Sequence, residues 1–344
     1  MNFTTSKPEI KEASCFVGDK TITRVARIAI YVVIISISVF GNLLVIAIAH
    51  RSKLLEKTTN LFIVNMCVAD LLITVLYMPR AAAMFVVGYE WLLHGTLGLS
   101  TCKAVPFLME VATAVTIFTV VLIGIDRVLS VCFPFKKIIQ KRFSQVLIIA
   151  IWLLAAAFRF PVLFIELREE NGKLFCNLNL DHSFSKGASK TYYQTIMISI
   201  YIIPVLIIIL CYICLIVSIR RFKSARHLST EERSSREARN RSMLRLIVIV
   251  ISCFIMCWFL YSVIFVLDAY QVYISCELRF LRLVLAHSNS AITPCLYFIF
   301  SEHYREGLRK ILKIWRRNVP DNREIKSSEE LTMSRRKYIG TLSI

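Results

Sequence analysis

Glycine and proline are scarce in this sequence, which has 10 and 8 of them among 344 residues. The scarcity of both residues argues against a loop-rich or repeat design. The first 27 residues also lack the apolar core and small-residue cleavage site of a secretory signal peptide. We therefore expect the first long apolar run to direct its own insertion into a membrane.

Acidic residues are few as well: 23 Asp and Glu stand against 42 Lys and Arg, which gives a formal net charge of +19. Such an excess can indicate nucleic-acid binding, but here the basic residues flank long apolar runs. That arrangement is typical of loops that orient a membrane protein. No nucleic-acid partner is therefore expected.

Apolar residues are abundant, at 56% of the chain with a mean hydropathy of +0.62. Soluble domains are roughly 45–50% apolar, so lipid is the expected solvent. Seven apolar runs approach or exceed the roughly twenty residues that cross a bilayer as a helix. They cover residues 28–49, 59–78, 103–126, 144–164, 193–219, 244–267 and 280–300. Because backbone polar groups in lipid need internal partners, we predict an all-α bundle of seven transmembrane helices.

The basic residues predict how the bundle lies in the plasma membrane. They cluster after the first, third, fifth and seventh runs, whereas the other loops are sparser or charge-balanced. By the positive-inside rule, residues 1–27 are extracellular, residues 28–300 form the seven-helix domain, and the C-terminus is cytoplasmic. Residues 301–317 read as an amphipathic helix on the inner leaflet, and 318–344 as a disordered tail.

The cysteines and one turn motif describe the extracellular side. Most of the eleven cysteines lie in or beside apolar runs, where thiols behave as small hydrophobic groups. Residues 166–176 contain Asn171-Gly172, a strong turn signal, so we predict a β-hairpin in the second extracellular loop. Its second strand carries Cys176, and Cys102 is the expected disulfide partner on the same side of the membrane.

Two further cysteines, Cys15 and Cys276, also fall on the extracellular side. They either form a second bridge between the N-terminal segment and the last outer loop or remain as separate thiols. The sequence leaves this choice open. A palmitoylated tail is not expected, because no cysteine follows Cys295.

A set of distinctive residues occurs within and beside the apolar runs in a characteristic order. The set is Gly41, Asn42, Asn65, Ala69, Asp70, Cys102, Asp126, Arg127, Trp152, Cys176, Pro204, Tyr212, Phe254, Cys257, Trp258, Pro294 and Tyr297. Over about residues 28–316 the chain thus resembles the rhodopsin-like (class A) G-protein-coupled receptors. The resemblance implies a receptor that activates a heterotrimeric G protein and is not an enzyme.

The resemblance also implies an activation switch. Arg127 would swing toward the G protein after being held at rest by Asp126, and Tyr212 and Tyr297 would meet near it in the active state. The packing switch between the ligand pocket and the cytoplasm would comprise Ile117, Pro204 and Phe254. Trp258 would lie at the floor of the pocket. From the residues alone, Arg127 can also be a snorkelling interfacial arginine, and Trp258 can be core filler.

An acidic residue within a span, Asp70, indicates a functional site, because a carboxylate in lipid is costly. The resemblance implies a sodium site, the only cofactor expected here. Its members would be Asp70, Asn42, Thr116, Asn289 and Ser290. The alternative is a protonated, hydrogen-bonded structural aspartate.

Four positions depart from the family pattern. Val128 replaces the usual tyrosine, Leu260 stands where the family has the proline that kinks the sixth span, and Thr293 stands where Asn or Asp precedes Pro294. Without that proline, outward movement of the sixth span would rely on Ser252 or on local unwinding. Asn240 leaves Arg127 without a second acidic partner. These departures predict a looser resting state with measurable basal signalling.

The ligand is expected to be a neuropeptide, as in the peptide-binding branch. Met109 stands where amine receptors have an aspartate, and His287 stands where opsins have the retinal lysine. Glu110 and Asp268 would receive a basic or amidated peptide end, unless Glu110 pairs with Arg159. The candidate pocket residues are Met109, Glu110, Arg159, Tyr261, Phe265, Asp268, Arg279, Arg282 and His287, with the arginines available for a carboxylate.

The sequence leaves alternative functions open. Within the family, the ligand could instead be a small lipid or metabolite. A seven-span transporter or channel would need polar residues along several spans or inverted repeats, and neither is visible. Short motifs add a glycosylation acceptor at Asn2, arrestin-binding phosphosites at Ser327, Ser328, Thr332 and Ser334, and a PDZ-binding end at Leu342–Ile344.

Overall fold

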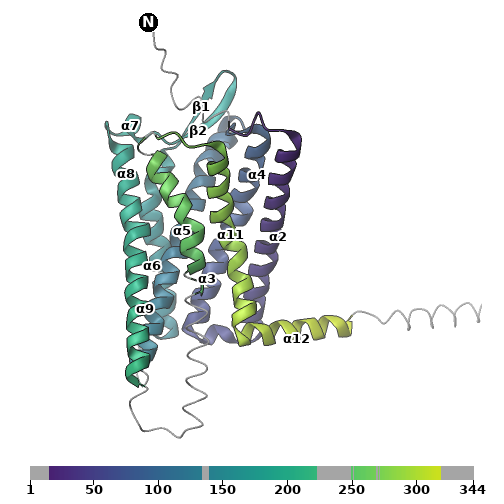
Figure 1. Cartoon of the computed structure of the whole chain (residues 1–344), viewed down its shortest axis with the longest axis vertical. Helices are drawn as coiled ribbons and strands as arrows, with labels where there is room; N and C mark the ends of the chain where they lie inside the picture. Colours follow the sequence, from purple (N-terminus) through teal and green to yellow (C-terminus); the bar gives the residue numbers. More distant parts are fainter. Residues whose placement is uncertain are drawn as a thin grey trace, which may run out of the picture. The chain divides into compact units, whose positions relative to one another are not determined.

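The computed structural model describes residues 15–133, 139–222, 249–250, 252–268, 270 and 272–318. The described residues divide into two compact units between Ser301 and Glu302, and each unit is described by itself. The first unit holds the helix bundle of Figure 1, and the second begins with helix α12 (Glu302–Asn318).

Within the described residues, six helical stretches are long and apolar enough to cross a membrane. They are α2 (Thr21–Arg51), α3–η2–α4 (Thr58–Leu72, Ile73–Tyr77, Met78–Val87), α5 (Gly95–Cys132), α6–η3 (Lys141–Arg159, Phe160–Phe164), α8–η4–α9 (Ala188–Ile196, Met197–Ile202, Ile203–Phe222) and α11 (Cys276–Phe300). A shorter apolar helix, Ser252–Asp268, supplies the seventh. The predicted all-α bundle of seven transmembrane helices is confirmed.

The helices extend beyond the apolar runs that predicted them. Helix α2 begins at Thr21 rather than at residue 28, and α5 covers 95–132 rather than 103–126. A helix with the 38 residues of α5 is about 57 Å long at 1.5 Å per residue, whereas the hydrocarbon core is only about 30 Å thick. Hydropathy detects the part of a helix that fits the lipid, and backbone hydrogen bonding continues the helix past it.

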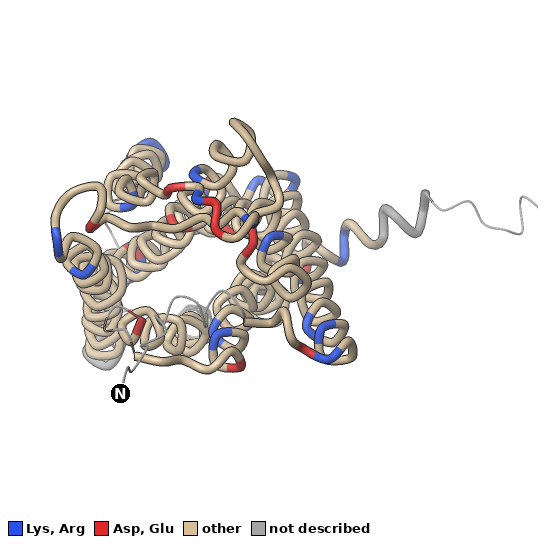
Figure 2. The backbone as a smooth tube through the Cα atoms, turned by 90° about the horizontal axis from the view of Figure 1, so that it is seen from above, with Lys and Arg blue, Asp and Glu red and all other residues tan. Residues whose placement is uncertain are grey.

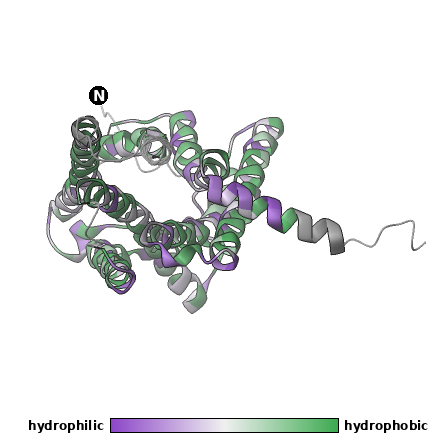
Figure 3. Cartoon of the chain, turned by 90° about the horizontal axis from the view of Figure 1, so that it is seen from below, coloured by the Kyte–Doolittle hydropathy of each residue, from purple (hydrophilic) through white to green (hydrophobic). Residues whose placement is uncertain are grey.

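Helix α5 occupies the centre of the bundle and packs against α3, α6 and α9. Side chains from Val111 to Ile117 are almost fully buried, so this stretch has no lipid-facing side. A helix that is apolar on all faces belongs in the interior of a bundle. Large apolar side chains on the peripheral helices are exposed instead, among them Phe40, Leu153 and Phe259. Apolar residues dominate these helices (Figure 3), as expected for surfaces that face lipid.

Helices α2 and α11 approach each other at one glycine. A β-carbon placed on Gly41 would lie 2.7 Å from Pro294 Cγ, which is closer than real side chains come. At a small residue, the backbone of one transmembrane helix can lie directly against a side chain of another helix. Gly41 therefore fixes the spacing between these two helices.

The predicted hairpin forms at one end of the bundle, called here the hairpin end. Strand β1 (Glu166–Glu170) pairs antiparallel with β2 (Lys173–Asn177), and Leu167 lies opposite Cys176. Asn171 and Gly172 form the turn with φ values of 53° and 75°, which is why this dipeptide is favoured there. Trp91 donates its backbone N–H to Leu174 at 2.7 Å, so the segment before α5 also pairs with the hairpin.

In the second unit, α12 occupies the residues where an amphipathic helix was predicted. Tyr304, Leu308 and Ile311 recur at helical spacing on one face, whereas Arg305 and Arg309 fall on another. Its role as a membrane-surface helix stays a prediction.

Candidate functional site

Asp126 and Arg127 lie near the end of α5 that is remote from the hairpin, called here the opposite end. The Asp126 carboxylate is buried and accepts hydrogen bonds from Thr58 Oγ1 at 3.1 Å and Thr59 Oγ1 at 2.8 Å. Arg127 Nε donates to the same carboxylate at 3.1 Å, and its Nη2 contacts both Asp126 and Thr59. The first turn of α3 therefore clamps the arginine against its acidic neighbour.

The two threonines of this clamp, Thr58 and Thr59, were not among the predicted site residues. They stand at the start of α3, where the sequence shows only a loop-to-helix boundary. No spacing rule relates residues 58 and 59 to residue 126, so the contact becomes visible only once α3 and α5 are packed together.

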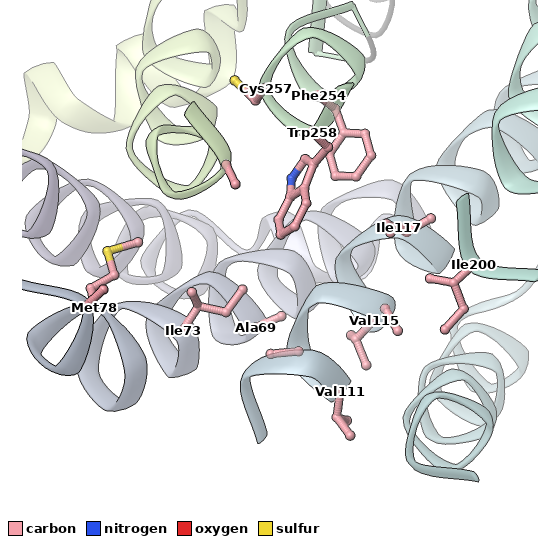
Figure 4. Close-up of a cluster of buried hydrophobic side chains, with 14 of the residues drawn as sticks. Ala69, Ile73, Met78, Val111, Val115, Ile117, Ile200, Phe254, Cys257 and Trp258 are labelled. Atoms are coloured by element: carbon pink, nitrogen blue, oxygen red, sulfur yellow. The ribbon is translucent and has the colours of Figure 1, made fainter. Parts of the chain in front are cut away.

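The predicted packing switch assembles in the centre of the bundle. Ile117, Phe254 and Trp258 belong to one buried cluster, shown in Figure 4, where the Trp258 indole projects from the Ser252–Asp268 helix toward the bundle interior. The Phe254 and Trp258 rings stack with centroids 6.1 Å apart. Pro204 is buried near the start of α9.

The remaining members of the predicted switch are not gathered together. Tyr212 is 38% exposed on α9, whereas Tyr297 is buried on α11. The helix Ser252–Asp268 is continuous through Leu260, and Ser262 Oγ donates to the Trp258 carbonyl oxygen at 2.9 Å. Such back-bonding by serine bends helices slightly, so it gives this proline-free helix a local source of curvature that the sequence reasoning missed.

Asp70 lies fully buried in α3 and accepts a hydrogen bond from Ser290 Oγ of α11 at 2.9 Å. Asn42 Nδ2 donates to the Ser290 carbonyl oxygen at 3.0 Å, which ties α2 into the same cluster. Three buried oxygens here have no hydrogen-bond partner: Asp70 Oδ2, Asn42 Oδ1 and Thr116 Oγ1. Oxygen atoms of this kind are the ligands that hard cations prefer. Asn289 is buried one residue before Ser290.

Toward the hairpin end, the alternative that pairs Glu110 with Arg159 is the one the structure contains. Arg159 Nη1 lies 2.9 Å from Glu110 Oε2, and the arginine is only 1% exposed. Removing two charges from water costs free energy. The pair can hold α5 and α6 together because the attraction between the two charges offsets that cost.

A second charged group joins the Ser252–Asp268 helix to α11. Arg279 binds Asp268 through both terminal nitrogens, at 2.8 and 3.2 Å, and Arg282 Nη1 binds the same carboxylate at 2.9 Å. The Arg282 guanidinium also lies over the Tyr261 ring, 5.5 Å from its centroid. Phe265 stacks near Tyr261 at 6.3 Å. Acidic and basic residues surround the helix ends seen from the hairpin end in Figure 2.

The last two pocket candidates, Met109 and His287, are both buried. His287 Nδ1 shares a hydrogen bond of 2.8 Å with the Tyr31 hydroxyl of α2. The Tyr77 ring lies 5.5 Å from the imidazole. Tyr31 and Tyr77 were missed from the sequence, because each is one aromatic residue in an apolar run.

Both disulfides at the hairpin end are formed: Cys102 joins Cys176, and Cys15 joins Cys276. Next to the second bridge, Phe16 is buried against Phe85 with ring centroids 5.2 Å apart. Buried Arg27 binds Asp19 and, at 2.7 Å, Glu277. The N-terminal segment is therefore fixed to the start of α11 by a covalent bond and ion pairs, which the sequence left open.

Several predicted residues lie outside the described part of the chain. These are Asn2, Asn240, Ser327, Ser328, Thr332, Ser334 and Leu342–Ile344. The glycosylation, arrestin and PDZ hypotheses that depend on them stay predictions.

The arrangement is that of a multi-pass membrane protein with polar groups near both ends of one central helix. Residues 41–297 match the model of the family described as 7 transmembrane receptor (rhodopsin family). The chain belongs to this family. Its members signal through G proteins in response to extracellular ligands and are not enzymes.

Individual relatives cover most of the chain. The allatostatin-A receptor of Bombyx mori is 28% identical over 80% of this chain and 76% of its own length. The human protein named "Probable G-protein coupled receptor 19" is 30% identical over 89% of this chain and 72% of its own length. Somatostatin receptor type 4 of Rattus norvegicus is 24% identical over 86% and 74%, respectively.

Proposed function

We propose that this chain is a plasma-membrane receptor for an extracellular neuropeptide and activates a heterotrimeric G protein. In this proposal the hairpin end faces outward and the opposite end faces the cytoplasm. The charge distribution of the loops supports that orientation. Disulfides persist in oxidising surroundings, so the two bridges at the hairpin end also support it.

The observation that carries the proposal is the position of Glu110 and Arg127 on a single helix. Glu110 pairs with Arg159 toward the hairpin end of α5, and Arg127 is clamped near its other end. Between them, the stretch from Val111 to Ile117 is buried on all sides. A ligand that shifts α5 or its neighbours at the hairpin end would therefore change the packing around Arg127, which makes a relay between the two sides of a membrane.

The relay would pass through the Ser252–Asp268 helix. Tyr261 contacts Trp258 with ring centroids 5.3 Å apart, and Trp258 stacks on Phe254. A ligand that moves Tyr261 would displace these rings and shift the cytoplasmic part of the helix. Arg127 would then leave Asp126 and Thr59 and bind the G protein. In this scheme the clamped arginine is the resting state.

A peptide ligand is supported by two relatives whose names identify an allatostatin-A receptor and a somatostatin receptor. Support also comes from the hairpin, which Cys102 and the Trp91 segment fix at the end where a large ligand would enter. Loops held on a rigid scaffold are common binding surfaces.

We also propose a regulatory sodium ion. The three partnerless oxygens of Asp70, Asn42 and Thr116, together with Ser290, suit a hard monovalent cation. When bound, the ion would neutralise the Asp70 carboxylate, and these side chains would hold α2, α3, α5 and α11 in one arrangement. Arrestin, a PDZ-domain protein and N-glycosylation at Asn2 remain proposals from the sequence.

The proposal is tested by expressing the chain in cells and recording second messengers during exposure to peptide pools. Lipid and metabolite pools are applied in parallel, and cells without the chain provide the control. A receptor-dependent response to peptides is the expected result. A response confined to lipids or metabolites would overturn the peptide assignment, and transport of a solute without any second-messenger response would overturn the receptor assignment.

A further inference from the structure

The charged side chains inside the hairpin end are out of balance. Apart from Arg27, which pairs with Asp19 and Glu277, four arginines occupy this part of the bundle within the described residues: Arg80, Arg159, Arg279 and Arg282. Two carboxylates stand against them, Glu110 and Asp268. Both carboxylates have partners, because Glu110 binds Arg159 and Asp268 is shared between Arg279 and Arg282. An excess of positive charge remains.

The excess is concentrated at Arg282 and Arg80. The Arg282 side chain is 15% exposed, and its Nε is buried without a hydrogen-bond partner. Arg80 Nη2 donates to the Tyr89 carbonyl oxygen at 3.0 Å, but its Nη1 is also buried without a partner. A buried donor that lacks an acceptor costs free energy, more so when it is charged. Both side chains are therefore suited to receive an acceptor.

The two guanidiniums act on a common region. Tyr77 lies close enough to both side chains for the positive charges of Arg80 and Arg282 to act on its hydroxyl group. Each guanidinium also lies over an aromatic ring, Arg80 over Trp91 at 5.2 Å and Arg282 over Tyr261 at 5.5 Å. Aromatic stacking restrains an arginine and leaves the edge of its planar fork available.

We propose that the receptor recognises a carboxylate of its ligand at Arg282, with Arg80 supplying the second positive charge. A guanidinium binds a carboxylate through two parallel N–H donors, which makes the pair strong and geometrically specific. A basic ligand group would find both acids occupied and would meet the excess positive charge. The inference rests on the proposed function and narrows its ligand to the acidic class.

The same contact would transmit the binding event. Arg282 touches Tyr261, and Tyr261 touches Trp258. A carboxylate drawn to Arg282 competes with Asp268 for its donors, so binding changes the link between α11 and the Ser252–Asp268 helix. Recognition and the start of helix movement therefore share one residue.

The experiment uses the full chain, with an N-terminal epitope tag to measure surface amount. Synthetic peptide pools and a pool of small carboxylic acids are applied, and second messengers are recorded. Each active compound is then remade with every carboxylate neutralised, as the amide or as Asn and Gln. Wild type is compared with Arg282→Gln, Arg282→Lys and the control Arg142→Gln, which removes an exposed arginine near the start of α6, remote from the hairpin end.

We expect neutralised analogues to be at least about tenfold less potent on wild type, because a charged hydrogen-bonded pair is lost. Arg282→Gln should weaken the acid forms by a similar factor and leave the neutralised forms unchanged. Arg282→Lys should be intermediate because it keeps the charge but loses the fork. Arg142→Gln should match wild type.

Equal potency of acid and neutralised peptides on wild type would overturn the inference while leaving the peptide receptor in place. This comparison uses wild type alone, so it tests carboxylate recognition even if Arg282→Gln does not reach the surface. Activity confined to the small carboxylic acids would support carboxylate recognition and overturn the peptide assignment. No response to any pool would overturn both.

Discussion

Arg159 of α6 binds Glu110 of α5 at 2.9 Å, and the arginine is almost completely buried. Two charges from different helices thus satisfy each other inside the bundle. Because the arginine is almost completely buried and the glutamate mostly buried, the pair makes the α5–α6 contact intolerant of a change in only one of them.

Replacing one member of this pair should destabilise the receptor strongly. We expect Glu110→Gln to cost about 3–5 kcal/mol, because Arg159 is left as an uncompensated buried charge. The double variant with Glu110→Gln and Arg159→Gln should recover much of the loss, since no net charge remains buried. Thermal unfolding of the purified receptor in detergent measures both. A double variant that is less stable than the single one would contradict the pairing.

Gly41→Ala should disturb the contact between α2 and α11. The added methyl group would fall 2.7 Å from Pro294 Cγ, and overpacking of this kind costs roughly 1–3 kcal/mol. Gly124→Ala is the matched control, because its methyl group would lie 3.6 Å from Cys211 Cβ, an ordinary contact. Thermal unfolding should separate the two variants, and equal midpoints would show that α2 and α11 are not packed as described.

Thr59→Val should raise signalling in the absence of ligand. The substitution keeps the side-chain volume but removes the hydroxyl that contacts both Asp126 and Arg127. Arg127 is then held by fewer groups and leaves the clamp more often. Basal second-messenger output per surface receptor is the measurement. Thr101→Val is the control, because that hydroxyl bonds only carbonyl oxygens of its own helix. Identical basal output from both variants would refute the clamp.

The segment before α8 should lose order in acid. The backbone N–H groups of Ser189 and Gly187 donate to the Asp181 carboxylate, and chiefly the bond from Ser189 lowers the pKa of Asp181. A lowered folded-state pKa means that the stabilisation is complete above the unfolded value of about 4 and disappears as pH falls through the lower folded value.

Hydrogen exchange of residues 181–196 at pH 3 and pH 6, corrected for intrinsic rates, detects this change. Wild type should lose protection at the lower pH, and Asp181→Asn should show little difference between the two. Acid-sensitive protection that persists in Asp181→Asn would assign the effect to another group.

The sequence predicts the seven helices and the hairpin because both depend on local patterns. Long apolar runs specify helices in lipid, and Asn171-Gly172 specifies its turn whatever surrounds it. The π-helical segments Ile73–Tyr77 and Met197–Ile202 were not predicted, since such segments are rare and have no distinctive local pattern.

The contacts of the candidate site could be predicted only in part. The sequence offered Glu110 either a ligand or Arg159, and the packing of α5 against α6 selects Arg159. It did not indicate that Asp268 would be shared by two arginines, because Arg279 and Arg282 meet Asp268 only when α11 packs beside the preceding helix. A periodic pattern gives the face on which a residue lies and does not give its partner on another helix.

The most direct test of the central claim is the response of Arg127→Ala to the peptide pools. The variant should reach the cell surface in wild-type amount and give no second-messenger response, while Arg142→Ala, which removes an exposed arginine near the start of α6, should respond normally. Preserved signalling by Arg127→Ala at equal surface expression would contradict the relay from the hairpin end to this arginine.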